Sequence, residues 1–313
     1  MQDPLKIFSG TSNPELALAI CNQLGVELGR AEIRQYSNEN IFVQIGENVR
    51  ERDVFVVQTL LTPRDTLELL IMLDSLRSAS AWRTTAVIPY YSYARSDKKD
   101  MPRISVAARL IADLLVTAGA NRVLTMTLHS AQVQGFFSVP CDQLLSTPAL
   151  SRYFKSKLDL RNFVAFAADA GSAKRVGAYA SWLDLPMGFA DKRRVSDTEV
   201  EVRSVVGEVA GKNILIFDDE IAAATSLAET VAVLEKIGVG DIYVGAAHGV
   251  LSGAAVERIR GLRVKEVVVT DSVRVPPEKR IDKITVLSVA NLFGEAIKRI
   301  HTGESVSALF DDH

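Results

Sequence analysis

The stretch Asn213-Ile-Leu-Ile-Phe-Asp-Asp-Glu-Ile-Ala-Ala-Ala-Thr-Ser-Leu227 decides how this chain folds. Its branched apolar run, residues 214–217, predicts a strand that is buried on both faces. Two adjacent carboxylates, Asp218 and Asp219, end this run, and small residues then lead to a helix near Leu227. In an open parallel sheet, ligands bind beyond the carboxyl ends of the strands, where helix N-termini attract anions. The stretch therefore predicts a site where carboxylates contact sugar hydroxyls or magnesium and the loop receives a phosphate.

The same alternation of strand-sized apolar runs and amphipathic helical runs continues along the chain. It predicts an α/β fold with mainly parallel sheets that helices cover on both faces. Alternating polar and apolar residues over 198–206 predict a short antiparallel hairpin or flap. Strands are expected at 5–9, 41–45, 53–58, 86–90, 122–128, 163–168, 214–217, 242–247, 266–270 and 284–288, and helices at 14–24, 64–78, 105–117, 173–182, 226–237 and 254–260.

The length of 313 residues is enough for two domains with substantial cores. We expect the boundary at Ser146, where a helix start follows a turn. Residues 1–145 and 146–290 would then form two similar α/β domains of ordinary size. The last segment, 291–313, begins with a helical pattern and is expected to pack back on the first domain.

Composition indicates an ordinary globular protein, with 48% hydrophobic and 24% charged residues. A formal net charge of −2 gives no electrostatic reason to expect nucleic acid or an anionic membrane as partner. The apolar runs are too short to span a membrane, and the N-terminus lacks the pattern of a signal peptide. The two cysteines, Cys21 and Cys141, fit free thiols in a reducing cytoplasm, where we expect the protein.

Two further expected strands end in residues that can contact a metal ion or phosphate. His129 follows the strand at 122–128, and Asp169 follows the strand at 163–168 and opens Asp169-Ala-Gly-Ser-Ala-Lys-Arg175. Each residue also has a simpler interpretation: His129 as an ordinary loop histidine, and Asp169 as the N-cap of a helix. Three such strand ends in one chain are stronger support for a phosphate- and metal-binding site than any one of them.

Longer motifs cover nearly the whole chain and carry a resemblance to a known family. They include Val87-Ile-Pro-Tyr-Tyr-Ser-Tyr-Ala-Arg95, Gln132-Val-Gln-Gly-Phe-Phe137, Asp191-Lys-Arg-Arg194, Ala247-His-Gly-Val-Leu-Ser-Gly253 and Ser305-Val-Ser-Ala-Leu-Phe310. With these motifs the chain resembles the ribose-phosphate pyrophosphokinases, or phosphoribosyl-pyrophosphate synthetases. The resemblance implies two phosphoribosyltransferase-like domains and a homohexamer built from dimers. It also implies a Mg²⁺-dependent kinase of nucleotide biosynthesis that transfers diphosphate from ATP to the anomeric hydroxyl of ribose 5-phosphate and releases AMP.

The resemblance assigns roles residue by residue. His129 and Asp169 match magnesium-contacting positions, and Lys192 and Arg194 match catalytic cations of a flexible loop; taken alone, this basic triplet would be a solvated turn. The matching nucleotide-binding positions are Tyr36, Asn38, Asn40, Arg95 and Asp97. Those for ribose phosphate are Asp218, Asp219, Ala222, Ala223, Ala224, Thr225 and Ser226. Positions that match a regulatory site for ADP or activating inorganic phosphate are Gln134, Asp142, Ser305, Ser307 and Phe310.

Departures from the family pattern gather at the substrate positions. The family's ribose-phosphate loop reads Asp-Asp-x-x-Asp-Thr-x-Gly-Thr, whereas Ala222 replaces its third aspartate and Thr225 its glycine. Threonine would be strained at Thr225 if that position requires positive φ, so a changed loop is expected. Asn40, Thr127 and Ser172 also differ from the family's usual residues.

These departures lead to the hypothesis of a divergent pyrophosphokinase with altered substrate preference or kinetics. Two alternatives stay open. One is a different reaction on ribose phosphates and nucleotides, such as phosphorolysis. The other is a catalytically silent partner that regulates an active synthetase.

Overall fold

The computed structural model describes residues 5–194 and 200–309, and its internal contacts divide the chain into two units. Unit 1 takes the chain up to Leu145, together with Ser272–Arg274 and the segment that begins at Ser288. Unit 2 comprises Ser146–Asp271 and Val275–Leu287. Each unit has its own sheet and its own buried apolar clusters.

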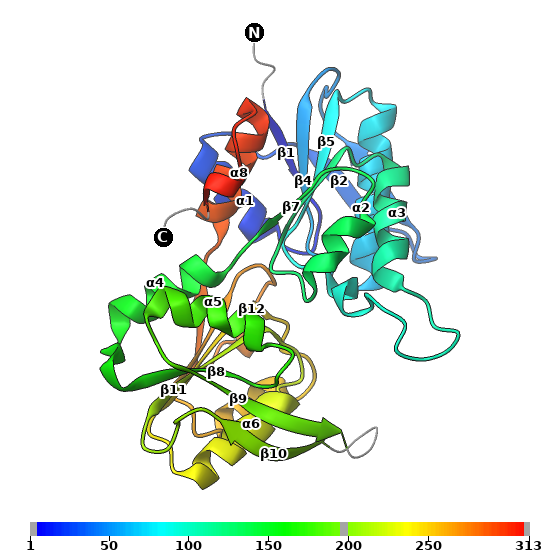
Figure 1. Cartoon of the computed structure of the whole chain (residues 1–313). Coiled ribbons are helices and arrows are strands. Elements are labelled where there is room, and N and C mark those ends of the chain that lie inside the picture. The colour runs from blue at the N-terminus through cyan, green and yellow to red at the C-terminus, as the bar shows by residue number, and fades with distance from the viewer. Residues whose placement is uncertain (1–4, 195–199, 310–313) are drawn as a thin grey trace. The chain divides into compact units, whose positions relative to one another are not determined.

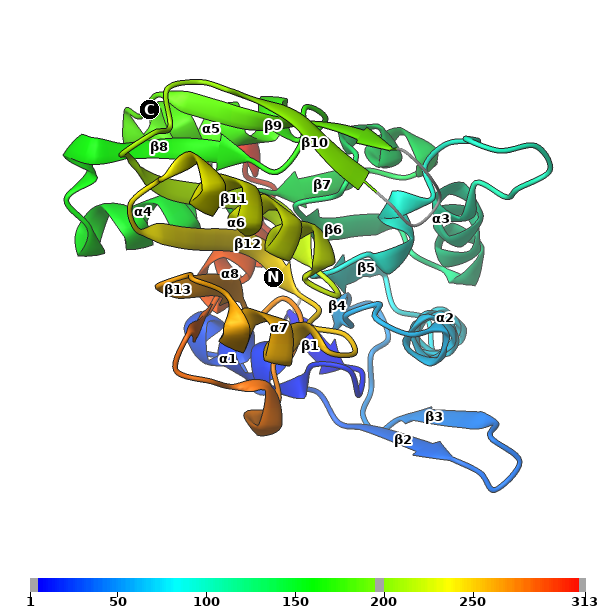
Figure 2. The same cartoon turned by 90° about the horizontal axis from the view of Figure 1, so that it is seen from below.

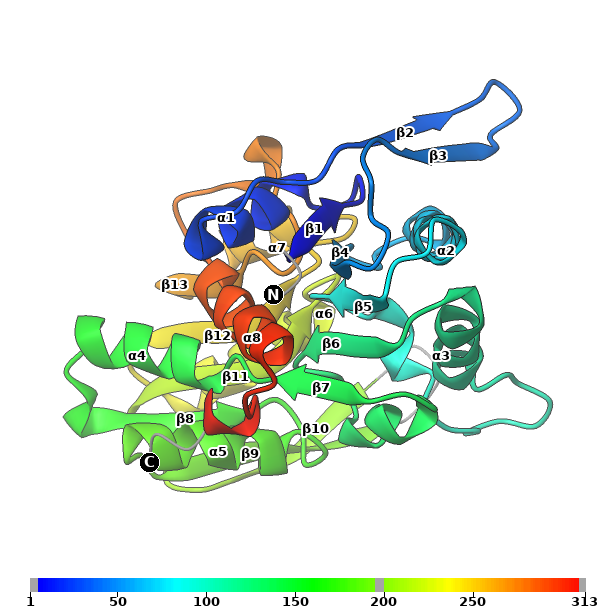
Figure 3. The same cartoon turned by 90° about the horizontal axis from the view of Figure 1, so that it is seen from above.

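Unit 1 contains a five-stranded parallel sheet with helices on both faces (Figures 1 and 3). The strand order is β1 (Lys6–Ser9), β4 (Asp53–Val57), β5 (Arg83–Ile88), β6 (Arg122–Met126) and β7 (Cys141–Leu144). Helices α2 (Pro63–Ser78) and α3 (Ala107–Ala118) cover one face, and α1 (Pro14–Leu24) and α8 (Ala290–Thr302) cover the other. A separate antiparallel hairpin, β2 (Ala31–Gln35) and β3 (Ile41–Ile45), projects away from this sheet (Figure 2).

Local sequence explains where the first helices of unit 1 begin. The Asn13 side chain accepts a hydrogen bond from the Leu16 amide, and proline takes the first position of α1. Thr62 and Asp65 form a capping box at the start of α2, in which each side chain accepts a hydrogen bond from the other's backbone amide. These contacts satisfy amides that have no partner inside the helix.

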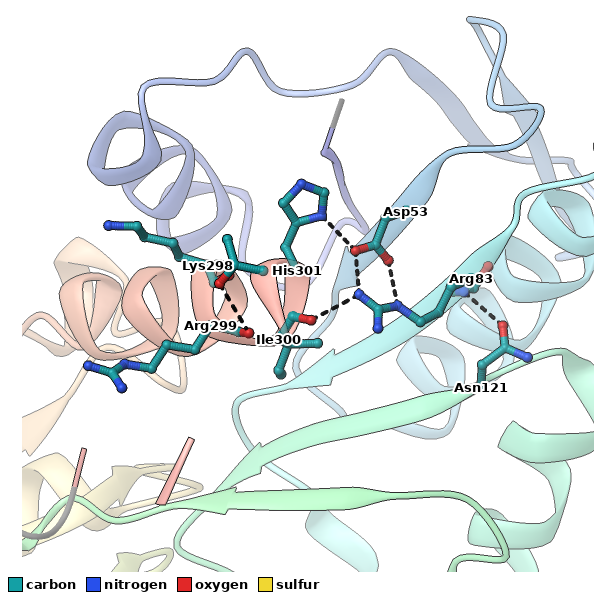
Figure 4. A network of polar contacts seen from close by, with 9 residues as sticks. Asp53, Arg83, Asn121, Lys298, Arg299, Ile300 and His301 are labelled. Carbon is teal, nitrogen blue, oxygen red and sulfur yellow. Dashed lines mark hydrogen bonds and ion pairs between the residues drawn. The ribbon is translucent and has the colours of Figure 1, made fainter. Parts of the chain in front are cut away.

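Helix α8 is joined to the unit 1 sheet by a network of polar contacts around Asp53 (Figure 4). The Asp53 side chain is only 1% exposed and accepts hydrogen bonds from Arg83 Nε and Nη2 at 2.8 and 2.5 Å. Its Oδ2 atom also lies 2.8 Å from His301 Nδ1, at the last turn of α8. Arg83 Nη2 donates a further bond to the Ile300 carbonyl. The chain's C-terminal helix is thus part of unit 1.

Unit 2 is built on a seven-stranded sheet, again with two helices on each face (Figure 1). The strand order is β10 (Val200–Val206), β9 (Met187–Arg194), β8 (Phe163–Ala167), β11 (Asn213–Ile221), β12 (Ile242–Gly249), β13 (Glu266–Thr270) and β14 (Ile284–Leu287). All neighbours are parallel except β9 and β10. Helices α6 (Thr225–Ile237) and α7 (Ala255–Gly261) pack on one face, and α4 (Thr147–Lys157) and α5 (Ala173–Leu183) pack on the other.

The predicted α/β class, with mainly parallel sheets flanked by helices, is confirmed. Strand β11 departs from its prediction, because it was expected to end at Phe217 but continues to Ile221. Its last residues pair with β12, with Asp218 opposite Ala246 and Ile221 opposite Gly249. The two carboxylates therefore lie inside a strand. No helix in the described part of the chain is long and apolar enough to cross a membrane.

Candidate functional site

The two adjacent carboxylates of β11 differ in burial. Asp219 pairs with Arg175 of helix α5, and its side chain is 4% exposed. Asp218 keeps 32% of its side chain exposed. One strand thus presents one buried and one partly exposed carboxylate.

Arg175 of helix α5 contacts both carboxylates. Its Nη1 atom lies 2.5 Å from Asp219 Oδ1 and 3.4 Å from Asp218 Oδ1. The Asp218 Oδ1 atom also accepts a hydrogen bond of 2.9 Å from the Asp219 amide. Burial, and after it the like charge of Asp219, raises the pKa of the Asp218 carboxyl well above its usual range, while Arg175 opposes this rise.

The raised pKa of Asp218 predicts a stability gain for Asp218→Asn. A folded-state pKa above the unfolded value means that stability falls as pH rises between these two values. At neutral pH the raised pKa of Asp218 therefore lowers the free energy of unfolding, and asparagine should raise the midpoint of thermal unfolding by about 2–4 °C per kcal/mol gained. The gain should disappear near pH ~3.9, the ordinary aspartate value, where wild-type Asp218 is already protonated.

Calorimetry at both pH values tests this expectation. Asp282→Asn is the control, because it removes an exposed carboxylate from the same unit. Equal midpoints for wild type and Asp218→Asn at neutral pH would contradict the expected strain between the two carboxylates.

The loop after β11 leads directly into helix α6. Only residues 222–224 form the loop, because Thr225 and Ser226 already belong to the helix. The loop is braced from outside, since Ser252 N donates to the Ala222 carbonyl at 2.9 Å and Arg258 Nη1 donates to the Ala223 carbonyl at 2.7 Å. The first amides of α6 then lie next to the end of β11, an arrangement that favours an anion.

The expected strain at Thr225 is not found, because Thr225 is not among the described residues with positive φ. The left-handed residue is instead Ala224, with φ 59° and ψ 17°. The bend that joins β11 to α6 is therefore made one residue before the position where the family carries glycine. Threonine at position 225 fits without backbone strain as the first residue of the helix.

Asp169 lies just beyond β8, which neighbours β11 in the sheet. Its exposed side chain accepts a hydrogen bond of 2.8 Å from the Ser172 amide, while Ser172 Oγ donates to the Asp169 carbonyl at 2.9 Å. These bonds hold the turn before α5 in one shape. Ser172, a departure from the family pattern, thus takes part in fixing Asp169.

Lys192 and Arg194 lie on β9, on the other side of β8 from β11. Lys192 pairs with Val202 and Arg194 pairs with Val200 of β10, which forms the edge of the sheet. The hairpin or flap was expected within 198–206, but strand β10 alone takes up most of that segment and pairs antiparallel with β9, where no strand was expected. Residues 195–199 lie outside the described chain. Three neighbouring strands, in the order β9-β8-β11, carry the basic residues, Asp169 and the two carboxylates.

Unit 1 holds the remaining metal and nucleotide candidates. Strand β6 ends at Met126, two residues before the expected end, so that exposed His129 follows at some distance in the loop. The short helix η1 (Ser92–Arg95) follows β5, the neighbour of β6, and contains exposed Arg95 two residues before half-buried Asp97. His129 and Arg95 therefore come after adjacent parallel strands.

Tyr36, Asn38 and Asn40 all lie in the turn of the β2–β3 hairpin. Tyr36 is 48% exposed, and its ring makes an edge contact with Phe42 at a centroid distance of 6.0 Å. Tyr36 N donates to the Asn40 carbonyl at 2.9 Å, and Asn38 Oδ1 accepts from the Asn40 amide at 3.2 Å. One hairpin tip thus presents an exposed ring next to two amide side chains.

The regulatory candidates lie in two places within unit 1. Gln134, in the short helix η2 (Ala131–Phe136), donates to Gln143 Oε1 at 3.0 Å, and neighbouring Asp142 pairs with Arg122. The Ser305 carbonyl accepts a bond of 3.0 Å from Arg299 of α8, and Ser307 begins the short helix η5 (Ser307–Leu309). Phe310 lies outside the described residues.

Whether the chain can bind a metal ion depends on the side chains that could act as its ligands. Within residues 5–194 and 200–309, no three His, Cys, Asp or Glu side chains gather as a metal-binding group. Mg²⁺ is usually bound by one or two carboxylates together with substrate phosphates, rather than by a cage of protein ligands. The exposed carboxylate of Asp169 fits this kind of site.

Sequence reasoning did not assign a role to Arg175. The residue stands in the motif that Asp169 opens, but nothing in the sequence says that it reaches a strand more than forty positions away. The only indication of a role for Arg175 in the sequence is that it follows Asp169 by six residues on an expected helix.

Comparison with known proteins gives concordant matches over both units. The family model of the N-terminal domain of ribose phosphate pyrophosphokinase matches residues 5–119, and that of the phosphoribosyl synthetase-associated domain matches residues 194–311. A ribose-phosphate pyrophosphokinase of Deinococcus radiodurans is 54% identical to the chain, covering 99% of it and 98% of the relative. One from Bacillus caldolyticus is 44% identical, with 99% of each chain covered.

A solved structure agrees with these matches. The crystal structure of phosphoribosylpyrophosphate synthetase from Mycobacterium smegmatis superimposes with a TM-score of 0.91 at 35% identity, covering 96% of this chain and all of the other. Identity at this level over nearly the full length of several relatives, together with the two domain matches, shows that the chain belongs to the ribose-phosphate pyrophosphokinase family.

Proposed function

We propose that the chain transfers the terminal diphosphate of ATP to the anomeric hydroxyl of ribose 5-phosphate, which gives phosphoribosyl pyrophosphate and AMP. The observation that carries this proposal is the order β9-β8-β11 in unit 2. These neighbouring strands carry basic residues, a turn with one carboxylate, and a carboxylate pair followed by a helix N-terminus. Such a set complements a phosphorylated sugar and a diphosphate group.

The proposed chemistry follows from the charges that change during transfer. Diphosphoryl transfer spreads negative charge over the oxygens of the moving group, so catalysis depends on cations placed around it. Lys192 and Arg194 are the proposed protein cations. Asp169 and His129 are each proposed to contact Mg²⁺, which would supply further positive charge to the phosphates. The carboxylates of β11 would accept hydrogen bonds from the ribose hydroxyls, while the first amides of α6 would hold the 5-phosphate.

The remaining assignments extend this proposal. The exposed ring of Tyr36 is proposed to stack on the adenine, with Asn38 and Asn40 beside it. Arg95 and Asp97 would contact the nucleotide phosphates and their ion. Units 1 and 2 would be the functional domains of a homohexamer, with inorganic phosphate or ADP as regulator at Gln134, Asp142, Ser305, Ser307 and Phe310. A cytoplasmic location fits the free thiols of Cys21 and Cys141.

Phosphorus NMR of the purified protein with ATP, Mg²⁺, phosphate and ribose 5-phosphate tests the reaction. We expect AMP and phosphoribosyl pyrophosphate to appear together at roughly 1 per second or faster. Consumption of AMP or ADP with phosphate would instead favour phosphorolysis. Unchanged substrates, with activity only after addition of a second synthetase, would favour a silent regulatory partner.

The altered loop is proposed to weaken the handling of ribose 5-phosphate. A carboxylate at position 222 would restore a charged hydrogen bond worth about 1.5–3 kcal/mol. We therefore expect Ala222→Asp to raise kcat/KM for ribose 5-phosphate about tenfold or more. Steady-state kinetics with ATP held in excess measures this change.

Ala223→Asp is the matched control, because it adds the same charge one residue further along the loop. Its kcat/KM should not rise. If Ala222→Asp also shows no gain, the missing carboxylate at position 222 does not limit activity, and altered substrate preference is not its consequence.

A further inference from the structure

The carboxylate pair of β11 is asymmetric in a way that the family pattern does not specify. Asp219 is 4% exposed, whereas Asp218 is 32% exposed. Loop 222–224 and the start of α6 continue from this strand. Of the two carboxylates, Asp218 is therefore the one more exposed to a sugar whose phosphate lies at the start of α6.

The position of Arg175 is determined by the packing beneath it. One helical turn further along α5, the Tyr179 ring stacks on Phe217 at a centroid distance of 4.0 Å and an interplanar angle of 9°. The Tyr179 hydroxyl lies 2.9 Å from Ser146 Oγ, and the side chain is fully buried. Because Phe217 immediately precedes Asp218, this stack fixes the position of α5 relative to the two carboxylates. Arg175 is thereby directed at Asp219.

The charges of the two carboxylates indicate a role for Arg175. A buried carboxylate without a cationic partner is costly, and a second carboxylate beside it increases the cost. Arg175 lies closer to Asp219 than to Asp218, by 2.5 against 3.4 Å. Its positive charge compensates the buried group and leaves the accessible group available to a ligand.

We propose that Arg175 is a positioning residue that holds Asp219 as a buried counter-ion, so that Asp218 is the carboxylate that contacts the ribose hydroxyls. This inference rests on the proposed function, because it assigns separate tasks within the same site. Asp218 binds the sugar directly. Asp219 and Arg175 act through Asp218, because they orient its side chain and determine the net charge around it.

The test uses the full-length protein with Arg175→Met, Arg175→Lys, Asp219→Asn and Asp218→Asn. We expect Asp218→Asn to raise the KM for ribose 5-phosphate about tenfold or more. Arg175→Met should raise the same KM with little change in the KM for ATP, and Arg175→Lys should recover part of the loss. The double variant Arg175→Met, Asp219→Asn should bind sugar better than Arg175→Met, because it no longer buries an unpaired carboxylate. Lys174→Met is the matched control, since it removes an exposed charge from the same helix.

Direct calorimetric binding of ribose 5-phosphate separates this inference from the proposed function. Wild type that binds no ribose 5-phosphate would overturn both. Wild type that binds it while Arg175→Met binds equally well would overturn only the role of Arg175. Equal losses of binding for Asp219→Asn and Asp218→Asn would overturn the division between the carboxylates. If Arg175→Met does not fold, as judged by circular dichroism, Arg175→Lys and the two asparagine variants still decide the outcome.

Discussion

Replacement of Lys192 by alanine is expected to lower the rate of diphosphoryl transfer roughly 100- to 1,000-fold, with a similar loss for Arg194→Ala. The reason is electrostatic, because a cation aimed at the charge that develops in the transition state contributes on this scale. Both residues lie on β9, next to the strand that leads to Asp169. Since the cations act on the transition state, kcat should fall while the KM for ribose 5-phosphate changes little.

The rate of AMP formation at saturating substrates measures this effect. Lys236→Ala is a suitable control, because Lys236 is an exposed cation of the same unit near the end of α6. A loss of less than about tenfold for both β9 variants would favour the simpler interpretation, a solvated basic turn, and would remove the main protein cations from the proposed mechanism.

Asp53→Ala should produce the largest loss of stability. The carboxylate is 1% exposed and joins Arg83 of β5 to His301 of α8, so its removal leaves a largely buried guanidinium without its charge partner. Breaking a buried ion pair in this way costs about 3–5 kcal/mol. For units of this size we expect the unfolding midpoint to fall by roughly 6–20 °C.

Thermal unfolding followed by circular dichroism checks the loss, and hydrogen exchange should show the weakest protection in α8. Asp74→Ala is the control, because its ion pair with Arg77 is half-exposed and such pairs contribute about 0–1 kcal/mol. A midpoint within about 2 °C of wild type would show that the contacts of Figure 4 do not anchor the C-terminal helix.

Much of the fold could be predicted because its causes are local. Strands such as β13 are short runs of branched apolar residues. Helices α1 and α2 each begin with a capping residue that is followed by proline, which is a local signal for a helix start. The strands that the sequence pattern missed have weaker signals. Strand β7, Cys141–Leu144, is short and mostly polar at the edge of its sheet, and β2, Ala31–Gln35, pairs only with β3. Their backbone is ordered by a partner strand rather than by apolar periodicity.

The candidate site likewise combines residues that the local sequence indicates with features that it does not. Asp169, Asp218 and Asp219 stood out in the sequence because acidic residues follow or end apolar runs there. The extension of β11 beyond Phe217 could not be seen, because pairing of its last residues with β12 decides it. The left-handed bend at Ala224 was equally hidden, since alanine gives no local signal for positive φ.

The sequence by itself determined the alternation of strands and helices, the chemistry available at several strand ends, and the family to which the chain belongs. These depend on residue type and short-range spacing. Only the tertiary structure decided that β8 lies between β9 and β11, that Arg175 reaches Asp219, and that His301 meets Asp53 from 248 positions away. Such pairings depend on sheet order and helix packing, which bring distant residues together for reasons that no local pattern contains.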